Sequence, residues 1–131
     1  MKICAISDTH GYLPDIKPCD ILLICGDISP LNYQRSIPLM NDWIDCEFTE
    51  WVKNLPCEKV VFIAGNHDLF LERTPKEIIR DNLSILTNNK AKYLEDDYYD
   101  YLSDTGKIYR IYGTPACRIF GNWALCILMI H

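Results

Sequence analysis

The stretch "KVVFIAGNHD" (residues 59–68) changes abruptly from apolar to polar residues. Its first part is a short run of β-branched and aliphatic residues, which is typical of a buried strand in a parallel sheet. A glycine, an amide, an imidazole and a carboxylate follow directly. The amide and the imidazole need partners that the end of a sheet does not ordinarily offer. Asn66 and His67 are therefore candidate functional residues.

Two earlier segments repeat this pattern. "KICAIS" (residues 2–7) and "DILLICGD" (residues 20–27) are also short apolar runs that stop in polar residues. The first is followed by Asp8 and His10, and the second ends in Gly26 and Asp27. The carboxyl ends of neighbouring parallel strands lie side by side. We therefore expect the three polar segments to converge on one crevice.

The donor atoms gathered there predict a metal site. Carboxylate, imidazole and amide oxygen together suit divalent manganese, iron or zinc, and one carboxylate can bridge two ions. Taken singly, Asp8 and Asp27 would first be assigned to turns or helix caps, and His10 is more often typical of a surface or core histidine than of a ligand. The glycines beside Asp27 and Asn66 let backbone and ligands approach closely.

The three motifs together resemble those of the calcineurin-like metallophosphoesterase family. The family's ordered motifs D-x-H, G-D and G-N-H-[DE] correspond to "SDTHG", "CGDIS" and "AGNHD". By this resemblance Asp8 and His10 would bind a first metal ion and Asp27 would bridge two ions. Asn66 would bind the second ion and touch the phosphate, and His67 would be the acid that helps the leaving group depart. The resemblance implies a hydrolase that cleaves small phosphomonoesters or phosphodiesters with two divalent ions (Mn, Fe or Zn).

Asp68 has two readings at this point. It is a candidate catalytic residue, because its carboxylate could accept a hydrogen bond from His67 and raise the pKa of that imidazole. Capping of the turn that follows is an equally good explanation.

The carboxyl-terminal part departs from the family pattern. The family continues with a strand that ends in His and then a G-H-x-H motif, and the sequence contains no G-H-x-H. "YGTPACRIFGNWA" (residues 112–124) resembles the stretch before the fourth motif, and "LCILMIH" (residues 125–131) looks like a strand followed by a histidine. His131 is therefore a candidate metal ligand, with a frayed chain end as the alternative.

This departure leads to three expectations. We expect the domain to be truncated at its carboxyl terminus, with its second sheet incomplete. The alternative function is a truncated or degenerate relative that binds metal or phosphate weakly, with little or no turnover. We also expect self-association through an exposed sheet edge.

Two helices are expected from the spacing of apolar residues. Residues 40–55 carry apolar side chains at helical intervals, including two tryptophans and Phe48 that we assign to the core. A second helix begins in "TPKEIIRDNL" (residues 74–83), where Thr74 would cap, Pro75 would fit the first position and Glu77 would complete a capping box.

Further strands are expected at "KAKYL" (residues 90–94) and "KIYRIYG" (residues 107–113), the second because its apolar residues alternate. The acidic and aromatic "EDDYYDY" (residues 95–101) is predicted to be a solvated loop. Together these elements predict an α/β fold, a layered sandwich of mixed β-sheets flanked by helices. Without a linker or repeat, residues 1–131 are expected to form a single domain.

Composition narrows the partners and the compartment. The chain has 131 residues, of which 49% are apolar, and a net charge of −5. This charge argues against nucleic acid or an anionic membrane surface as a partner. The seven cysteines are scattered without a C-x-x-C motif, which favours a reducing compartment. With no signal-like start and no apolar run of roughly 18 residues, we expect a soluble cytoplasmic protein without a membrane anchor.

Overall fold

A four-stranded parallel sheet forms the centre of the chain, whose structure is a computed structural model that describes residues 1–115 and 127–130. Its strands lie in the order β1-β2-β3-β4, and every neighbouring pair is parallel. The three apolar runs and the predicted strand at 90–94 are all confirmed. The bounds are β1 (Ile3–Ile6), β2 (Cys19–Cys25), β3 (Cys57–Ile63) and β4 (Ala91–Tyr93).

Three consecutive helical segments connect β2 to β3. They are α1 (Ile37–Trp43), the π-helical η1 (Ile44–Phe48) and α2 (Thr49–Asn54). The Ser36 side chain caps the start by accepting a hydrogen bond from the Leu39 amide. The predicted helix is thus confirmed, although it begins three residues earlier than expected.

The helix predicted at residues 74–83 is also present, as α4 (Lys76–Leu86), but its predicted capping is wrong. No side chain makes a capping hydrogen bond at its start, and Thr74 has an extended backbone. The reason lies in the short helix α3 (Leu69–Arg73), which the sequence did not reveal. The Thr74 amide donates to the Phe70 carbonyl and so closes that helix.

A second, antiparallel sheet contains β5 (Asp97–Leu102), β6 (Ile108–Thr114) and β7 (Ile127–Ile130) in that order. The strand predicted at 107–113 is confirmed as β6, but the loop predicted at 95–101 is wrong. Tyr101 points into the core and Tyr98 toward solvent, so the tyrosines alternate as a strand requires. The Arg110 guanidinium of β6 makes two hydrogen bonds to Asp100, which offsets the exposed charge of β5.

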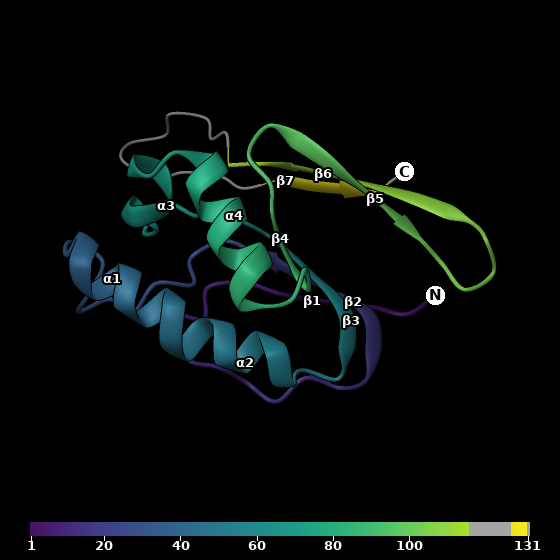
Figure 1. Ribbon diagram of the computed structural model, residues 1–131, viewed down its shortest axis with the longest axis horizontal. Coiled ribbons are helices and arrows are strands. Elements are labelled where there is room, and N and C mark those ends of the chain that lie inside the picture. Colours follow the sequence, from purple (N-terminus) through teal and green to yellow (C-terminus); the bar gives the residue numbers. More distant parts are fainter. Residues whose placement is uncertain (116–126, 131) are drawn as a thin grey trace.

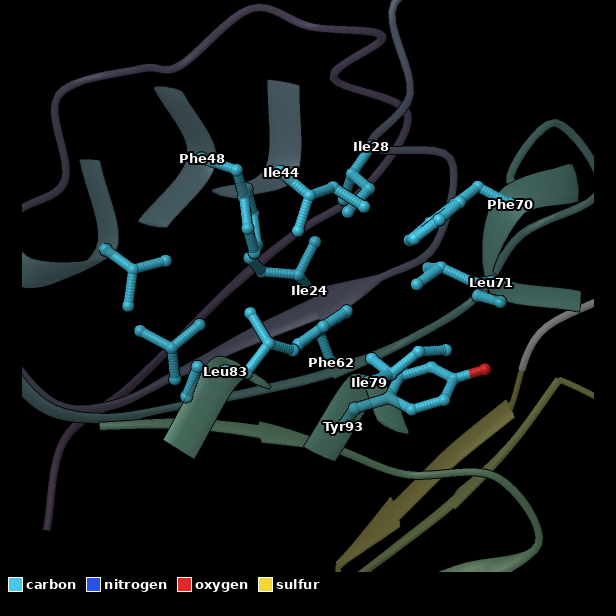
Figure 2. Close-up of a cluster of buried hydrophobic side chains, with 14 of the residues drawn as sticks. Ile24, Ile28, Ile44, Phe48, Phe62, Phe70, Leu71, Ile79, Leu83 and Tyr93 are labelled. Carbon is cyan, nitrogen blue, oxygen red and sulfur yellow. The ribbon is translucent and has the colours of Figure 1, made fainter. Parts of the chain in front are cut away.

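The parallel sheet lies between the helices and the antiparallel sheet, which confirms the layered α/β sandwich (Figure 1). Successive β2 residues serve the two sides: Leu22 and Ile24 pack toward the helices, and Ile21 and Leu23 toward the antiparallel sheet. Figure 2 shows the helical side of this core, where Phe62 of β3 lies among apolar side chains of η1 and α4. No helix in the described ranges is long and apolar enough to cross a membrane.

Candidate metal centre

The predicted site residues lie at the carboxyl ends of the first three strands. The loop after β1 runs alongside the loop after β2, and three backbone hydrogen bonds join them. These run from Asp8 N to Gly26 O (3.1 Å), from His10 N to Asp27 O (3.0 Å) and from Gly11 N to Ile28 O (2.8 Å). The pairing of β1 with β2 is thus extended beyond the strands themselves. This extension places the first motif directly against the second.

Asp8, His10 and Asp27 form a cluster of possible metal ligands. One donor atom from each residue lies within 4.8 Å of the donors of the other two. Asp8 is exposed and Asp27 is buried, so the cluster is open to solvent on the Asp8 side. Three donors at this separation can face a single divalent ion.

The His10 side chain supports this interpretation independently. Its Nδ1 atom is buried and has no hydrogen-bond partner among the described residues. A buried ring nitrogen without a partner is unfavourable, because it has lost its contact with water. A metal ion is one ligand that these donors fit.

The backbone at the three candidate ligands is also unusual. The φ angles are 53° at Asp8, 45° at His10 and 55° at Asp27, all in the left-handed region. Residues with a side chain rarely adopt this region, and the associated strain clusters at functional sites. The strain turns three side chains from two adjacent loops toward one another.

The third motif lies tightly against Asp27. A Cβ atom at Gly65 would overlap the Asp27 carboxylate and backbone nitrogen, so only glycine fits there. Two residues further on, the His67 amide donates a hydrogen bond of 2.8 Å to Asp27 Oδ1. The Asp27 carboxylate is therefore held by the third motif while it faces the first.

His67 and Asn66 lie on the loop that carries these contacts. The His67 ring meets the His10 ring edge to face, with centroids 5.2 Å apart. Asn66 is half-buried between Gly65 and His67 in this loop. Its predicted role as a metal ligand, like that of His67 as an acid, stays a prediction.

Gln34 is a candidate site residue that sequence reasoning missed. Its Oε1 atom lies 2.7 Å from Nδ1 of His67. An amide oxygen can only accept, so this contact is a hydrogen bond in the forms of His67 that carry a proton on Nδ1. Nothing in "LNYQRS" (residues 31–36) points to this role, since the two residues meet only in the folded chain.

Asp68 contacts the backbone of two neighbouring loops, and its predicted catalytic role beside His67 stays a prediction. Its carboxylate accepts hydrogen bonds from the backbone amides of Gly65, Asp27 and Ser29. It makes no capping bond to α3, so the capping alternative is wrong. Burial raises the pKa of Asp68, whereas the surrounding donors act in the opposite direction.

The negative charge of the site also affects the pKa of a neighbouring thiol. Burial, and to a smaller extent the Asp8 carboxylate, raises the pKa of Cys25 at the end of β2. The remaining candidate, His131, lies outside the described residues, so its predicted role as a metal ligand stays open.

Comparison with known proteins shows which family and which curated proteins this chain is similar to. The calcineurin-like phosphoesterase family matches residues 1–125 of this chain. The metallophosphoesterase domain-containing protein 1 of Homo sapiens is 27% identical over 137 aligned positions, which cover 93% of this chain and 39% of that protein. The protein of the same name from Mus musculus matches equally well.

A longer relative comes from Emericella nidulans. A probable rhamnogalacturonate lyase C is 24% identical over 124 residues, or 95% of this chain and 11% of that protein. The chain thus spans well under half the length of these curated relatives. The family match covers nearly all residues of this chain, including the two motifs that build the cluster and the third motif, which supports Asp27. This chain belongs to the calcineurin-like phosphoesterase family.

Proposed function

We propose that this chain hydrolyses phosphomonoesters or phosphodiesters with two divalent metal ions bound at the cluster. The observation that carries the proposal is the convergence of donors from Asp8, His10 and Asp27 within 4.8 Å at the ends of β1 and β2. The family supports a metal-dependent phosphoesterase in general. The ion pair, its identity as manganese, iron or zinc, and the small phosphate ester as substrate are our extension.

Each residue of the cluster has a distinct task in this proposal. Asp8 and His10 hold one ion, Asp27 is shared between two, and Asn66 serves the second. When bound, divalent ions neutralise the charge of phosphoryl oxygens and lower the pKa of bound water to near neutrality. The chain itself has a net charge of −5, so bound cations also offset its repulsion of an anionic substrate.

His67 supplies the proton for the leaving group. In its doubly protonated form the ring donates its Nδ1 proton to Gln34 in a hydrogen bond and gives its Nε2 proton to the departing oxygen, which leaves a neutral imidazole. The edge-to-face contact with His10 keeps this imidazole beside the metal ligands. Acid and cations therefore act on the same phosphate group.

The test combines metal analysis with a generic assay. The purified chain is loaded with Mn²⁺, dialysed and measured for metal content, and then assayed on p-nitrophenyl phosphate and bis-p-nitrophenyl phosphate. We expect about two ions per chain. Asp27→Ala should lose more metal than Asp8→Ala or His10→Ala, because a bridging carboxylate serves both ions. Asp15→Ala, on the exposed surface, is the control.

Two results would contradict the proposal in different ways. If Asp27→Ala binds metal as well as the unaltered chain, the bridging assignment is wrong. If the unaltered chain holds one weak ion and turns over neither ester, the degenerate relative becomes the better description.

A further inference from the structure

The Asp68 carboxylate lies at the junction of the second and third motifs. Its side chain is only 1% exposed, in a chain where most carboxylates face solvent. Oδ2 accepts from Gly65 N and Asp27 N, both at 2.8 Å. Oδ1 accepts from Ser29 N at 2.9 Å and also from the Ser29 hydroxyl. One buried group thus receives four close hydrogen bonds from two loops.

These hydrogen bonds restrain the backbone around Asp27. The loop after β2 must hold Asp27 at a φ of 55°, which costs free energy and needs support from its surroundings. Asp68 binds the amide of Asp27 itself and the amide two residues beyond it. The Ile28 amide adds a longer contact of 3.4 Å. The strained turn is therefore tied to a buried anion throughout its length.

The two carboxylates also support each other's loops. Asp68 accepts from the Asp27 amide, while Asp27 accepts from the His67 amide at 2.8 Å. These two reciprocal hydrogen bonds join loops that are about forty positions apart in the sequence. Movement of either loop would break hydrogen bonds on both.

We propose that Asp68 is a positioning residue that fixes Asp27 for metal binding, which rests on the proposed function of the cluster. Asp68 acts through the backbone amides of residues 27–29 and 65 and does not touch the metal. Its loss loosens the loop after β2 even in the metal-free protein. The metal then binds more weakly, because its ligand must be ordered on binding.

The test compares Asp68→Asn with two other variants. Asn has the shape of Asp, but one acceptor is replaced by an N–H₂ group that cannot accept from the loop amides. Ser29→Ala removes only the hydroxyl donor and is the milder change. Leu83→Ala, in the α4 part of the core, is the control that lowers stability without touching either loop.

Two measurements are made on each folded variant. Amide hydrogen exchange of residues 27–29 and 65 is compared with that of Leu22 and Ile24 in the metal-free protein, and Mn²⁺ affinity is measured by calorimetry. Asp68→Asn should raise the relative exchange of the loop amides at least about tenfold and weaken Mn²⁺ binding about 10- to 100-fold. Ser29→Ala should change both in the same direction by a few-fold. Leu83→Ala should change neither the relative exchange of the loop amides nor the Mn²⁺ affinity.

The outcomes separate this inference from the proposed function. Wild-type loop protection and Mn²⁺ affinity in a folded Asp68→Asn variant would overturn the inference, as would an equal loss of affinity in Leu83→Ala. If Asp68→Asn does not fold, unchanged loop exchange in Ser29→Ala overturns it instead. If the unaltered chain takes up no Mn²⁺, the proposed function fails, and the exchange measurement still decides the role of Asp68.

Discussion

Side chains at left-handed backbone positions distinguish the candidate centre at the scale of single residues. Asp8, His10 and Asp27 all have positive φ angles, where Asn or Gly would be easier to accommodate. All three are candidate ligands, and the backbone amide of each donates a hydrogen bond to a neighbouring loop. Among the described residues, three of the six positive-φ residues other than glycine thus lie where the proposed chemistry needs side chains to converge, and Asn88, Asn89 and Asp96 lie in turns or bends elsewhere.

Gly65→Ala should abolish the close contact between the loop after β3 and Asp27. The added Cβ would overlap the Asp27 carboxylate, so the ligand or the loop must move. We expect Mn²⁺ affinity to fall about 10- to 100-fold, as measured by calorimetry. Gly106→Ala is the control: alanine is strained at its φ of 79°, but nothing lies within 4 Å of the new atom, so the variant tests a glycine-to-alanine change without crowding at the site. Equal affinity in both alanine variants would show that the packing at Gly65 is unimportant for metal binding.

Gln34→Leu should selectively impair proton donation by His67. Loss of the 2.7 Å contact frees the ring, so turnover should fall about tenfold on an ester with a poor leaving group. An ester with a good leaving group needs no acid and should be cleaved at nearly the same rate. Gln34→Glu retains an acceptor atom, so the ratio of its rates on the two esters should be that of the unaltered chain.

The readout for Gln34 does not depend on turnover alone. Ring ¹⁵N chemical shifts of His67 report which nitrogen carries the proton, and the metal-free protein suffices for this measurement. We expect a proton on Nδ1 in the unaltered chain and a mixture of tautomers in Gln34→Leu. A uniform loss of rate on both esters, with unchanged shifts, would exclude the orienting role.

At the scale of elements, β4 and β5 show how aromatic residues join the layers. The Tyr93 ring of β4 packs against Phe62 of β3, with centroids 5.2 Å apart (Figure 2). Its hydroxyl donates to Glu95 at 3.4 Å. In β5, Tyr101 donates to Glu58 of β3 at 2.7 Å and anchors the second sheet. Both tyrosines combine an apolar body with a polar contact at the rim of the core.

Tyr93 should make the fold sensitive to alkali. Burial, and then the Glu95 carboxylate, raises the pKa of Tyr93 well above its ordinary value. Because the folded-state pKa is the higher one, the associated stability is complete below about pH 10, the ordinary tyrosine pKa, and is lost as pH rises above it. One such group costs about 1.4 kcal/mol by pH 11.

Tyr93→Phe should therefore retain more of its neutral-pH stability at pH 11 than the unaltered chain. The measurement is urea unfolding, followed by tryptophan fluorescence, at pH 8 and pH 11. Tyr98→Phe is the control, because Tyr98 is 52% exposed. If both variants lose the same stability as the unaltered chain, titration of Tyr93 makes no contribution.

At the scale of the whole molecule, the candidate centre joins segments that span the first half of the sequence. Its ligands follow β1 and β2, and the loop after β3 supports them. In the unfolded chain these donors are far apart and bind a metal poorly. A ligand that binds only the folded state stabilises it in proportion to the logarithm of its concentration.

Mn²⁺ should accordingly raise the free energy of unfolding of the whole chain. At a concentration 100 times the dissociation constant, we expect a gain of about 2.7 kcal/mol. Asp27→Ala should lose most of this gain, and Asp15→Ala should keep it. Urea unfolding with and without Mn²⁺ measures the difference. An equal gain in both variants would place the bound ion somewhere other than the cluster.

The sequence by itself determined the parallel strands, their order of motifs and the donor residues at their ends. These follow from local features, because apolar runs and the polar residues next to them are adjacent in the chain. Only the family resemblance assigned roles to Asp8, His10, Asp27, Asn66 and His67, and those roles await measurement. The strand at 97–102 was missed because local charge concealed its alternation.

The tertiary structure decided which side chains support the donors. Gln34 meets His67 across 33 positions, and Asp68 meets the Asp27 amide across 41. No periodicity or motif encodes such contacts, because they depend on how two loops pack after the sheet has formed. Burial then gives them their effect, since a carboxylate surrounded by backbone amides must hold those amides in place. The candidate donor residues were readable in the sequence, and the contacts that support them were not.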